Sequence, residues 1–158
     1  MMWRFMILIL LVVYAIVDPA WLSGQSEIIR TLTCHFFHAN IFHLLANALT
    51  IYIMFRRWKV WQIIVAYVIA ICSIVFYPVQ AIGFSNIVYA MMGLKTPPLG
   101  SPWWTLPSTK AFLVVTVAML LFPNVSAVTH IISFVMGLAV SMSVRWFNLI
   151  RNDSARYI

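Results

Sequence analysis

The chain has 158 residues, of which 64% are hydrophobic and 8% are charged, and its formal net charge at pH 7 is +7. Soluble domains are about half apolar and about a quarter charged, so this composition excludes the ordinary soluble class and predicts an integral membrane protein. The basic residues stand singly or in small groups beside apolar runs, which favours anionic lipid headgroups over nucleic acid. We therefore expect the lipid bilayer, and no nucleic acid, among the partners.

Long apolar segments alternate along the chain with polar stretches that contain Pro and Gly. Such segments are typical of transmembrane helices, because a helix satisfies its own backbone polar groups in lipid. No repeat or low-complexity stretch divides the chain, so a single domain over residues 1–158 is expected. The predicted spans are 5–17, 36–55, 60–79, 85–94, 111–122 and 127–149. The expected fold class is an all-α membrane protein, a bundle of six transmembrane helices.

Lys and Arg are distributed unequally between the two sides that these six spans define. One side receives only Arg30, and all the other basic residues fall on the opposite side. The positive-inside rule then predicts cytoplasmic termini, and we expect a multi-pass protein of a prokaryotic cell membrane. An alternative is that residues 1–20 are a cleaved signal peptide, because Arg4 precedes a short apolar stretch. Charge counting does not separate the two, since cleavage leaves the other spans in the same orientation.

The fourth predicted span is short and is expected to begin in the middle of the membrane. It ends at Lys95, so Ser85 lies about 15 Å from the cytoplasmic end at about 1.5 Å per residue. The same rise puts Asn47 at about 14 Å, His43 at about 20 Å and His130 at about 22 Å. These side chains from three helices share the outer half of the membrane. Polar and ionisable groups at such depth are expensive and indicate a functional site.

Helical spacing also puts these residues on shared faces. His43 and Asn47 are four residues apart on the second span, and Ser85 and Tyr89 are four apart on the fourth. Small residues on the sixth span, in a stripe behind His130, allow two helix backbones to approach closely. We expect the fourth and sixth helices to pack together and to bring Ser85 within reach of His130.

Each of these features also has a simpler explanation. A lone serine in a membrane helix is usually a packing residue, and His43 with Asn47 is by itself more simply an interhelical hydrogen-bond pair. His35, His38 and His43 have spacings that scatter their imidazoles around a helix, which argues against a metal site. The two cysteines form neither a metal motif nor a disulfide framework. We therefore expect no metal and no cofactor.

Four segments resemble motifs of the rhomboid family of intramembrane serine proteases. Residues 83–93 resemble the active-site motif G-x-S-G with its apolar helix, and residues 38–47 look like H-x-x-x-x-H-x-x-x-N. Residues 27–30 are similar to the family's E-x-W-R, and residues 130–137 resemble H-x-x-G-x-x-x-G. Each motif is weak alone, but all four occur in the family's order and spacing. The resemblance implies a compact rhomboid-like bundle.

The resemblance agrees with the chemistry that the residues permit. No Asp or Glu lies inside a predicted span, so a Ser-His-Asp triad is excluded and a dyad of Ser85 and His130 remains. Tyr89 is expected to pack on the imidazole and to orient it, a role that the resemblance also implies. The side chains of His43 and Asn47, with the backbone N–H of Ser85, are the candidate donors to the oxyanion.

The remaining motif residues are assigned orienting or structural roles. The resemblance implies such roles for Gly83, Glu27 and Arg30, and His38 is expected to hold the first loop. Asn86 departs from the family pattern, because it follows the serine where the family usually has Gly. The other departures are Ile29 for Trp, Ser133 for Gly, and Arg56-Arg57-Trp58-Lys59 where the family commonly carries Gly and Glu.

Three functions are consistent with the sequence. The first is a serine endopeptidase that cleaves transmembrane segments of other membrane proteins near the outer face. The second is a catalytically weak or inactive rhomboid-like protein that binds membrane clients, with Asn86 as its mark. The third is a small transporter or channel subunit that uses the polar cluster as an ion path. No pattern in the sequence predicts an oligomeric state.

Overall fold

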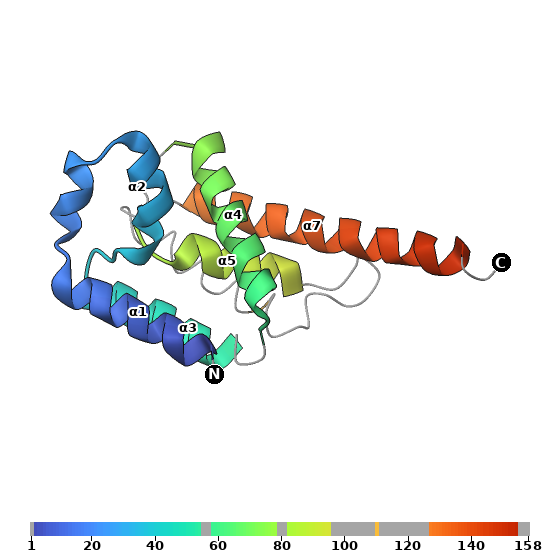
Figure 1. Cartoon of the computed structure of the whole chain (residues 1–158), viewed down its shortest axis with the longest axis horizontal. Coiled ribbons are helices and arrows are strands. Elements are labelled where there is room, and N and C mark those ends of the chain that lie inside the picture. The colour runs from blue at the N-terminus through green and yellow to red at the C-terminus, as the bar shows by residue number, and fades with distance from the viewer. Residues whose placement is uncertain (1, 55–57, 79–81, 96–109, 111–126, 155–158) are drawn as a thin grey trace.

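A computed structural model describes residues 2–54, 58–78, 82–95, 110 and 127–154 of the chain. Every regular element in these ranges is a helix, so the described part of the chain is all-α (Figure 1). The predicted fifth span, 111–122, lies outside the described residues. The α-helices are α1 (Met2–Ile16), α2 (Glu27–Thr33), α3 (Ile41–Met54), α4 (Val60–Phe76), α5 (Ser85–Lys95) and α7 (Ala127–Ser154), and the 3-10 helices are η1 (Pro19–Gly24) and η2 (Cys34–Phe36).

The second predicted span, 36–55, begins later in the structure than the sequence analysis expects. The chain bends by 69° between Glu27–Phe36 and Ile41–Ile53. The side chain of Asn40 explains where α3 begins, because its Oδ1 accepts a hydrogen bond at 2.9 Å from the backbone N–H of His43. An Asn in this position caps the first turn of a helix. His43 and Asn47 therefore lie on α3, whereas His38 precedes it.

The helix α2 was not predicted by the apolar pattern. The side chain of Ser26 caps it by accepting a hydrogen bond from the N–H of Ile29 at 3.4 Å. Glu27 in the first turn and Arg30 in the last also complement the helix dipole. Its short length explains why hydrophobic periodicity did not reveal it, since the whole helix covers only seven residues.

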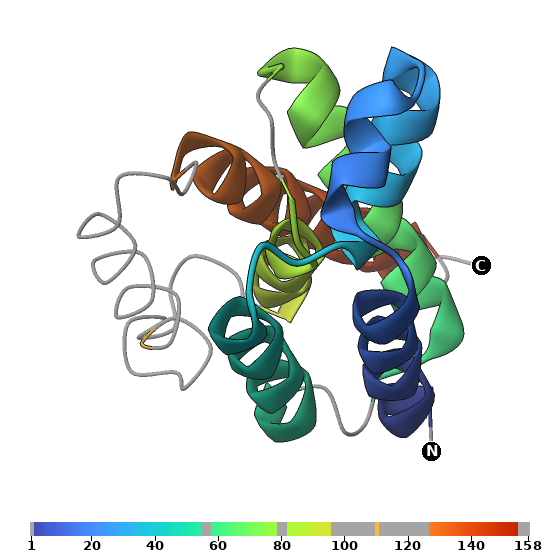
Figure 2. The same ribbon diagram turned by 90° about the vertical axis from the view of Figure 1, so that its left-hand side faces the viewer.

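The short helix α5 lies at the centre of the described part of the molecule. Figure 2 shows α5 with α3, α4 and α7 around it, and these three helices all contact it. Every residue from Ser85 to Gly93 is buried. A helix of 11 residues is shorter than the ~20 residues that a full membrane crossing needs. α5 is therefore enclosed by protein from Ser85 to Gly93.

Two glycines bring the backbones of α5 and α7 into contact. A Cβ atom at Gly93 would collide with the carbonyl oxygen of Phe134, and one at Gly137 would collide with the carbonyl oxygen of Ala90. Only glycine fits at either position without moving a backbone. This close packing places the first turn of α7 beside the beginning of α5.

The apolar surface agrees with a membrane location. Residues Ala127–Asn148 form one helix long and apolar enough to cross a bilayer, and Glu27–Phe36 with Ile41–Ile53 meets the same test as a bent pair. Trp3–Ile16 and Val60–Phe76 are shorter apolar helices. Large hydrophobic side chains such as Phe42 on α3 and Phe76 on α4 are at least three-quarters exposed. Apolar exposure of this extent is suited to lipid.

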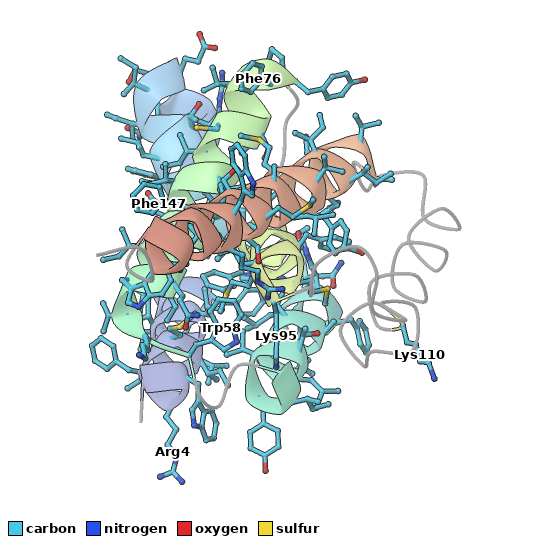
Figure 3. All side chains as sticks on the ribbon, turned by 90° about the vertical axis from the view of Figure 1, so that its right-hand side faces the viewer. Arg4, Trp58, Phe76, Lys95, Lys110 and Phe147 are labelled. Atoms are coloured by element: carbon cyan, nitrogen blue, oxygen red, sulfur yellow. The ribbon has the colours of Figure 1, made fainter. Side chains whose placement is uncertain are left out.

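The labelled basic side chains gather toward one end of the molecule. Figure 3 shows Arg4, Lys95 and Lys110 toward the end opposite Phe76. Trp58, which precedes α4, lies toward the same end as these basic residues. Arg4, Lys95 and Lys110 thus lie toward the end of the molecule opposite Phe76.

Candidate active site

Ser85 and His130 meet at the junction of α5 and α7. Ser85 is the first residue of α5, and His130 lies in the first turn of α7. The Nε2 atom of His130 and the Oγ atom of Ser85 are 2.6 Å apart, although the residues are 45 positions apart in sequence. Each side chain is 5% exposed. When Nδ1 of the neutral imidazole carries the proton, the serine hydroxyl donates this hydrogen bond to Nε2.

Tyr89 supports the imidazole from the next turn of α5. The ring centroids of Tyr89 and His130 are 4.7 Å apart, with an angle of 47° between the ring planes. Tyr89 is 1% exposed, so its ring is fixed by the surrounding core. The contact limits the rotation of the imidazole beside Ser85. A contact between these two rings was predicted from the sequence.

A hydrogen bond between two serine hydroxyls links α7 to α4, one turn after His130. Ser133, one turn after His130, donates a hydrogen bond from Oγ to the Oγ of Ser73 at 2.8 Å. Ser73 in turn donates to the carbonyl oxygen of Ala70 at 2.8 Å. Ser133 and Ser73 are both fully buried. From the sequence, Ser133 was predicted only to be a small packing residue, whereas in the structure its hydroxyl links α7 to α4.

Asn47 and His38 form a second polar contact, between α3 and the segment that precedes it. The Nδ2 of Asn47 and the Nε2 of His38 are 3.0 Å apart, so the amide donates to the imidazole when Nε2 is unprotonated. His38 is 0% exposed and Asn47 is 6% exposed. The rings of His38 and His43 make an edge contact with centroids 5.2 Å apart. His38 therefore contacts both residues that were expected to stabilise an oxyanion, in addition to lying in the first loop.

Gly83 connects this polar group to the start of α5. Its φ angle is +124°, a conformation that side-chain-bearing residues rarely adopt. A Cβ at Gly83 would also collide with the imidazole of His43. The backbone N–H of Gly83 donates to the carbonyl oxygen of Cys34 at 3.0 Å. The glycine thus lets His43 lie directly against the turn that leads into Ser85.

Glu27 and Arg30 lie farther from this chemistry. Both are on α2, where Glu27 is exposed and Arg30 is partly buried. Among the described residues, no side-chain hydrogen bond joins either of them to Ser85 or His130. Asn86, by contrast, directly follows Ser85 and is 2% exposed. Its Oδ1 has no hydrogen-bond partner within the described part of the chain.

Two supporting residues were not identified from the sequence. Asn40 caps α3 three residues before His43, and a capping residue before an apolar helix is a signal that could have been read. Ser73 carried no such signal, because a serine in an apolar span has no local pattern that marks its partner. Its link to Ser133 joins residues 60 positions apart.

Comparison with known proteins agrees with the motifs. A protein-family model described as the Rhomboid domain matches residues 25–147. This range contains all of the site residues described above, together with most of α7. No match to a curated protein was found.

Proposed function

The chain belongs to the rhomboid family, and we propose that it is an intramembrane serine endopeptidase acting on transmembrane segments of other membrane proteins. The observation that carries the proposal is the 2.6 Å distance between Ser85 Oγ and His130 Nε2. A hydroxyl becomes a useful nucleophile when a base within hydrogen-bond distance accepts its proton. The burial of both side chains inside an apolar bundle supports a substrate that is itself in the membrane.

In the proposed reaction, Ser85 Oγ attacks the carbonyl carbon of a substrate peptide bond while His130 Nε2 takes its proton. The protonated imidazole then gives this proton to the leaving amine nitrogen, which produces an acyl-enzyme. Water, deprotonated by His130, hydrolyses the ester and regenerates Ser85. The ring of Tyr89 orients the imidazole of His130, which is one of the roles that the acid has in a catalytic triad.

The oxyanion of each tetrahedral intermediate is assigned to three donors. The backbone N–H of Ser85 belongs to the first turn of α5, where helix N–H groups have no partner within the helix. Asn47 has two amide protons, and only one is needed for the contact with His38. His43 lies against Gly83, two residues before Ser85. Preorganised donors of this kind stabilise charge that develops in the transition state.

The substrate is proposed to be a transmembrane helix that unwinds locally at the outer half of the membrane. A peptide bond inside a regular helix is shielded by its own hydrogen bonds, so small or helix-destabilising residues near the cleavage point are expected. The basic residues at the opposite end, seen in Figure 3, support cytoplasmic termini by the positive-inside rule. The proposal thus describes a multi-pass protein whose active site opens away from the cytoplasm.

Labelling with a fluorophosphonate probe tests the proposal on purified full-length protein in detergent and in liposomes. We expect the wild type to be labelled and the variants Ser85→Ala and His130→Ala to remain unlabelled. Ser143→Ala is a matched control, because this serine of α7 is bonded only locally, to the carbonyl of Ala139. It should label as the wild type does. A folded wild type that stays unlabelled in both environments contradicts the proposal.

Asn86 supports one competing function, an inactive protein that binds membrane clients. Its buried amide stands directly after Ser85, where the rhomboid motif usually has Gly, and its Oδ1 lacks a partner in the described structure. On this alternative, clients are retained by the wild type without cleavage, and Ser85→Ala binds them equally well. The labelling experiment separates the two functions, since an inactive site does not react with the probe.

A further inference from the structure

Tyr67 of α4 has a hydroxyl group that binds a different element, the end of α2. Its Oη donates a hydrogen bond to the carbonyl oxygen of Leu32, with 2.6 Å between the two atoms. Leu32 lies in the last turn of α2, where the carbonyl groups of a helix have no partner within the helix. The tyrosine hydroxyl therefore caps α2 from another helix, at the point where η2 begins.

The ring of Tyr67 also contacts η2 itself. It meets the ring of His35 edge-on, with centroids 5.8 Å apart. It meets the ring of Phe36 at a centroid distance of 6.0 Å, a separation at which aromatic pairs attract each other in addition to the area that they bury. One residue of α4 thus holds the junction of α2 and η2 through a hydrogen bond and two ring contacts.

η2 in turn contacts the two residues that precede Ser85. The carbonyl oxygen of Cys34 accepts a hydrogen bond from the backbone N–H of Gly83 at 3.0 Å. The ring of Phe36 contacts the ring of Phe84, with centroids 6.4 Å apart. The turn that leads into the serine is therefore fixed on η2 by a backbone hydrogen bond and by a side-chain contact.

We propose that Tyr67 is a positioning residue for Ser85: by fixing η2 against α4, it sets the path of the backbone that leads into the nucleophile. The inference rests on the proposed function, in which Ser85 attacks the substrate. Tyr67 acts through Leu32 and η2 rather than by contact with the substrate. Because Gly83 has a positive φ angle and packs against the ring of His43, a displacement of η2 should move the serine and the oxyanion site together.

The same helix is also joined to the other half of the dyad. Ser73, farther along α4 than Tyr67, accepts a hydrogen bond from Ser133 of α7. α4 is thus connected to the turn before Ser85 through η2, and directly to the helix that carries His130. Small displacements between reacting groups are costly. A helix that carries neither group of the dyad is therefore expected to control their separation.

The variant Tyr67→Phe provides the test, because it removes the hydroxyl and keeps the ring. At a saturating concentration of fluorophosphonate, the rate constant of labelling should fall about fivefold or more, whereas the probe concentration that gives half of the maximal rate should change little. Hydrogen exchange of residues 83–88 should become faster, because η2 holds the turn less firmly. Tyr77→Phe is the matched control, since it removes a hydroxyl from a side chain that is 44% exposed at the end of the same helix. It should label and exchange as the wild type does.

Phe36→Leu disturbs the same connection from η2. It removes the ring that contacts both Tyr67 and Phe84. Slower labelling and faster exchange of residues 83–88 are expected for this variant also. It keeps the inference testable if Tyr67→Phe does not give folded protein.

Several outcomes would overturn the inference. A folded Tyr67→Phe variant that labels at the wild-type rate refutes it and leaves the dyad of Ser85 and His130 intact, even if thermal stability is lower. Slower labelling with unchanged exchange of residues 83–88 also refutes it, because the effect then does not pass through the turn. If the wild type itself does not react, the proposed function fails, and the exchange measurement still decides: unchanged exchange refutes the role of Tyr67, and faster exchange supports its hold on the turn.

Discussion

Ser133 of α7 donates a hydrogen bond to Ser73 of α4, with 2.8 Å between the two Oγ atoms, one turn after His130. This bond positions α7 by linking it to a helix that carries none of the proposed catalytic groups. α7 is therefore held from two directions, through the glycine contact with α5 and through this hydroxyl pair. The placement of His130 depends on both.

Substitution of the two serines should destabilise the protein unequally. Ser133→Ala removes one hydrogen bond but leaves Ser73 bonded to the Ala70 carbonyl, so a loss of about 0.5–1.5 kcal/mol in unfolding free energy is expected. Ser73→Ala leaves the buried Ser133 hydroxyl without this partner, which typically costs about 1–3 kcal/mol. Denaturation of both variants in the same detergent measures the difference. A larger loss for Ser133→Ala would contradict this account of the pair.

Gly137→Ala should separate α5 from α7. The new Cβ would collide with the carbonyl oxygen of Ala90, and backbone shifts of this kind typically cost about 1–3 kcal/mol. Because the same contact brings Ser85 to His130, fluorophosphonate labelling should fall by at least about tenfold. Gly24→Ala is the matched control, since nothing lies within 4 Å of a Cβ at that position. Equal labelling of the two variants would show that the helix contact does not control the dyad.

Asn47→Ala should affect turnover more than substrate binding. Loss of one oxyanion donor typically lowers kcat about 100-fold or more, with a smaller change in KM. His38→Ala removes the contact that holds the amide but leaves the amide in place, so its loss of kcat should be smaller. Cleavage kinetics of a single-span reporter protein in liposomes provide the comparison. A His38→Ala variant that is less active than Asn47→Ala would reverse the proposed roles.

Asn86→Ala tests whether the residue after the serine suppresses activity. The Oδ1 of the buried Asn86 has no hydrogen-bond partner in the described part of the chain. We therefore expect the labelling rate to change little on substitution. A large gain in labelling would identify Asn86 as an inhibitory substitution and would favour the client-binding function for the wild type.

The all-helical fold class and the family were predictable from the sequence. Hydrophobic runs with few charges report a membrane environment directly, and the family match over residues 25–147 confirms the membership that the motifs indicated. The structure agrees at the level of an all-α protein with an apolar helix suited to a bilayer. The six-span count and the cytoplasmic termini stay predictions. The late start of α3 and the presence of α2 were not anticipated, because short capped segments leave little periodic signal.

The sequence alone determined which residues carry polar chemistry within apolar segments, and which of them share a helix face. Spacing of four residues is a local property, so the placement of His43 and Asn47 on one helix face required no tertiary information. The sequence predicted that Ser85 and His130 come within reach of each other, and the tertiary structure decided the distance of 2.6 Å between their side chains. Such contacts depend on how distant helices fit against each other, and a glycine that permits close approach does not specify its partner.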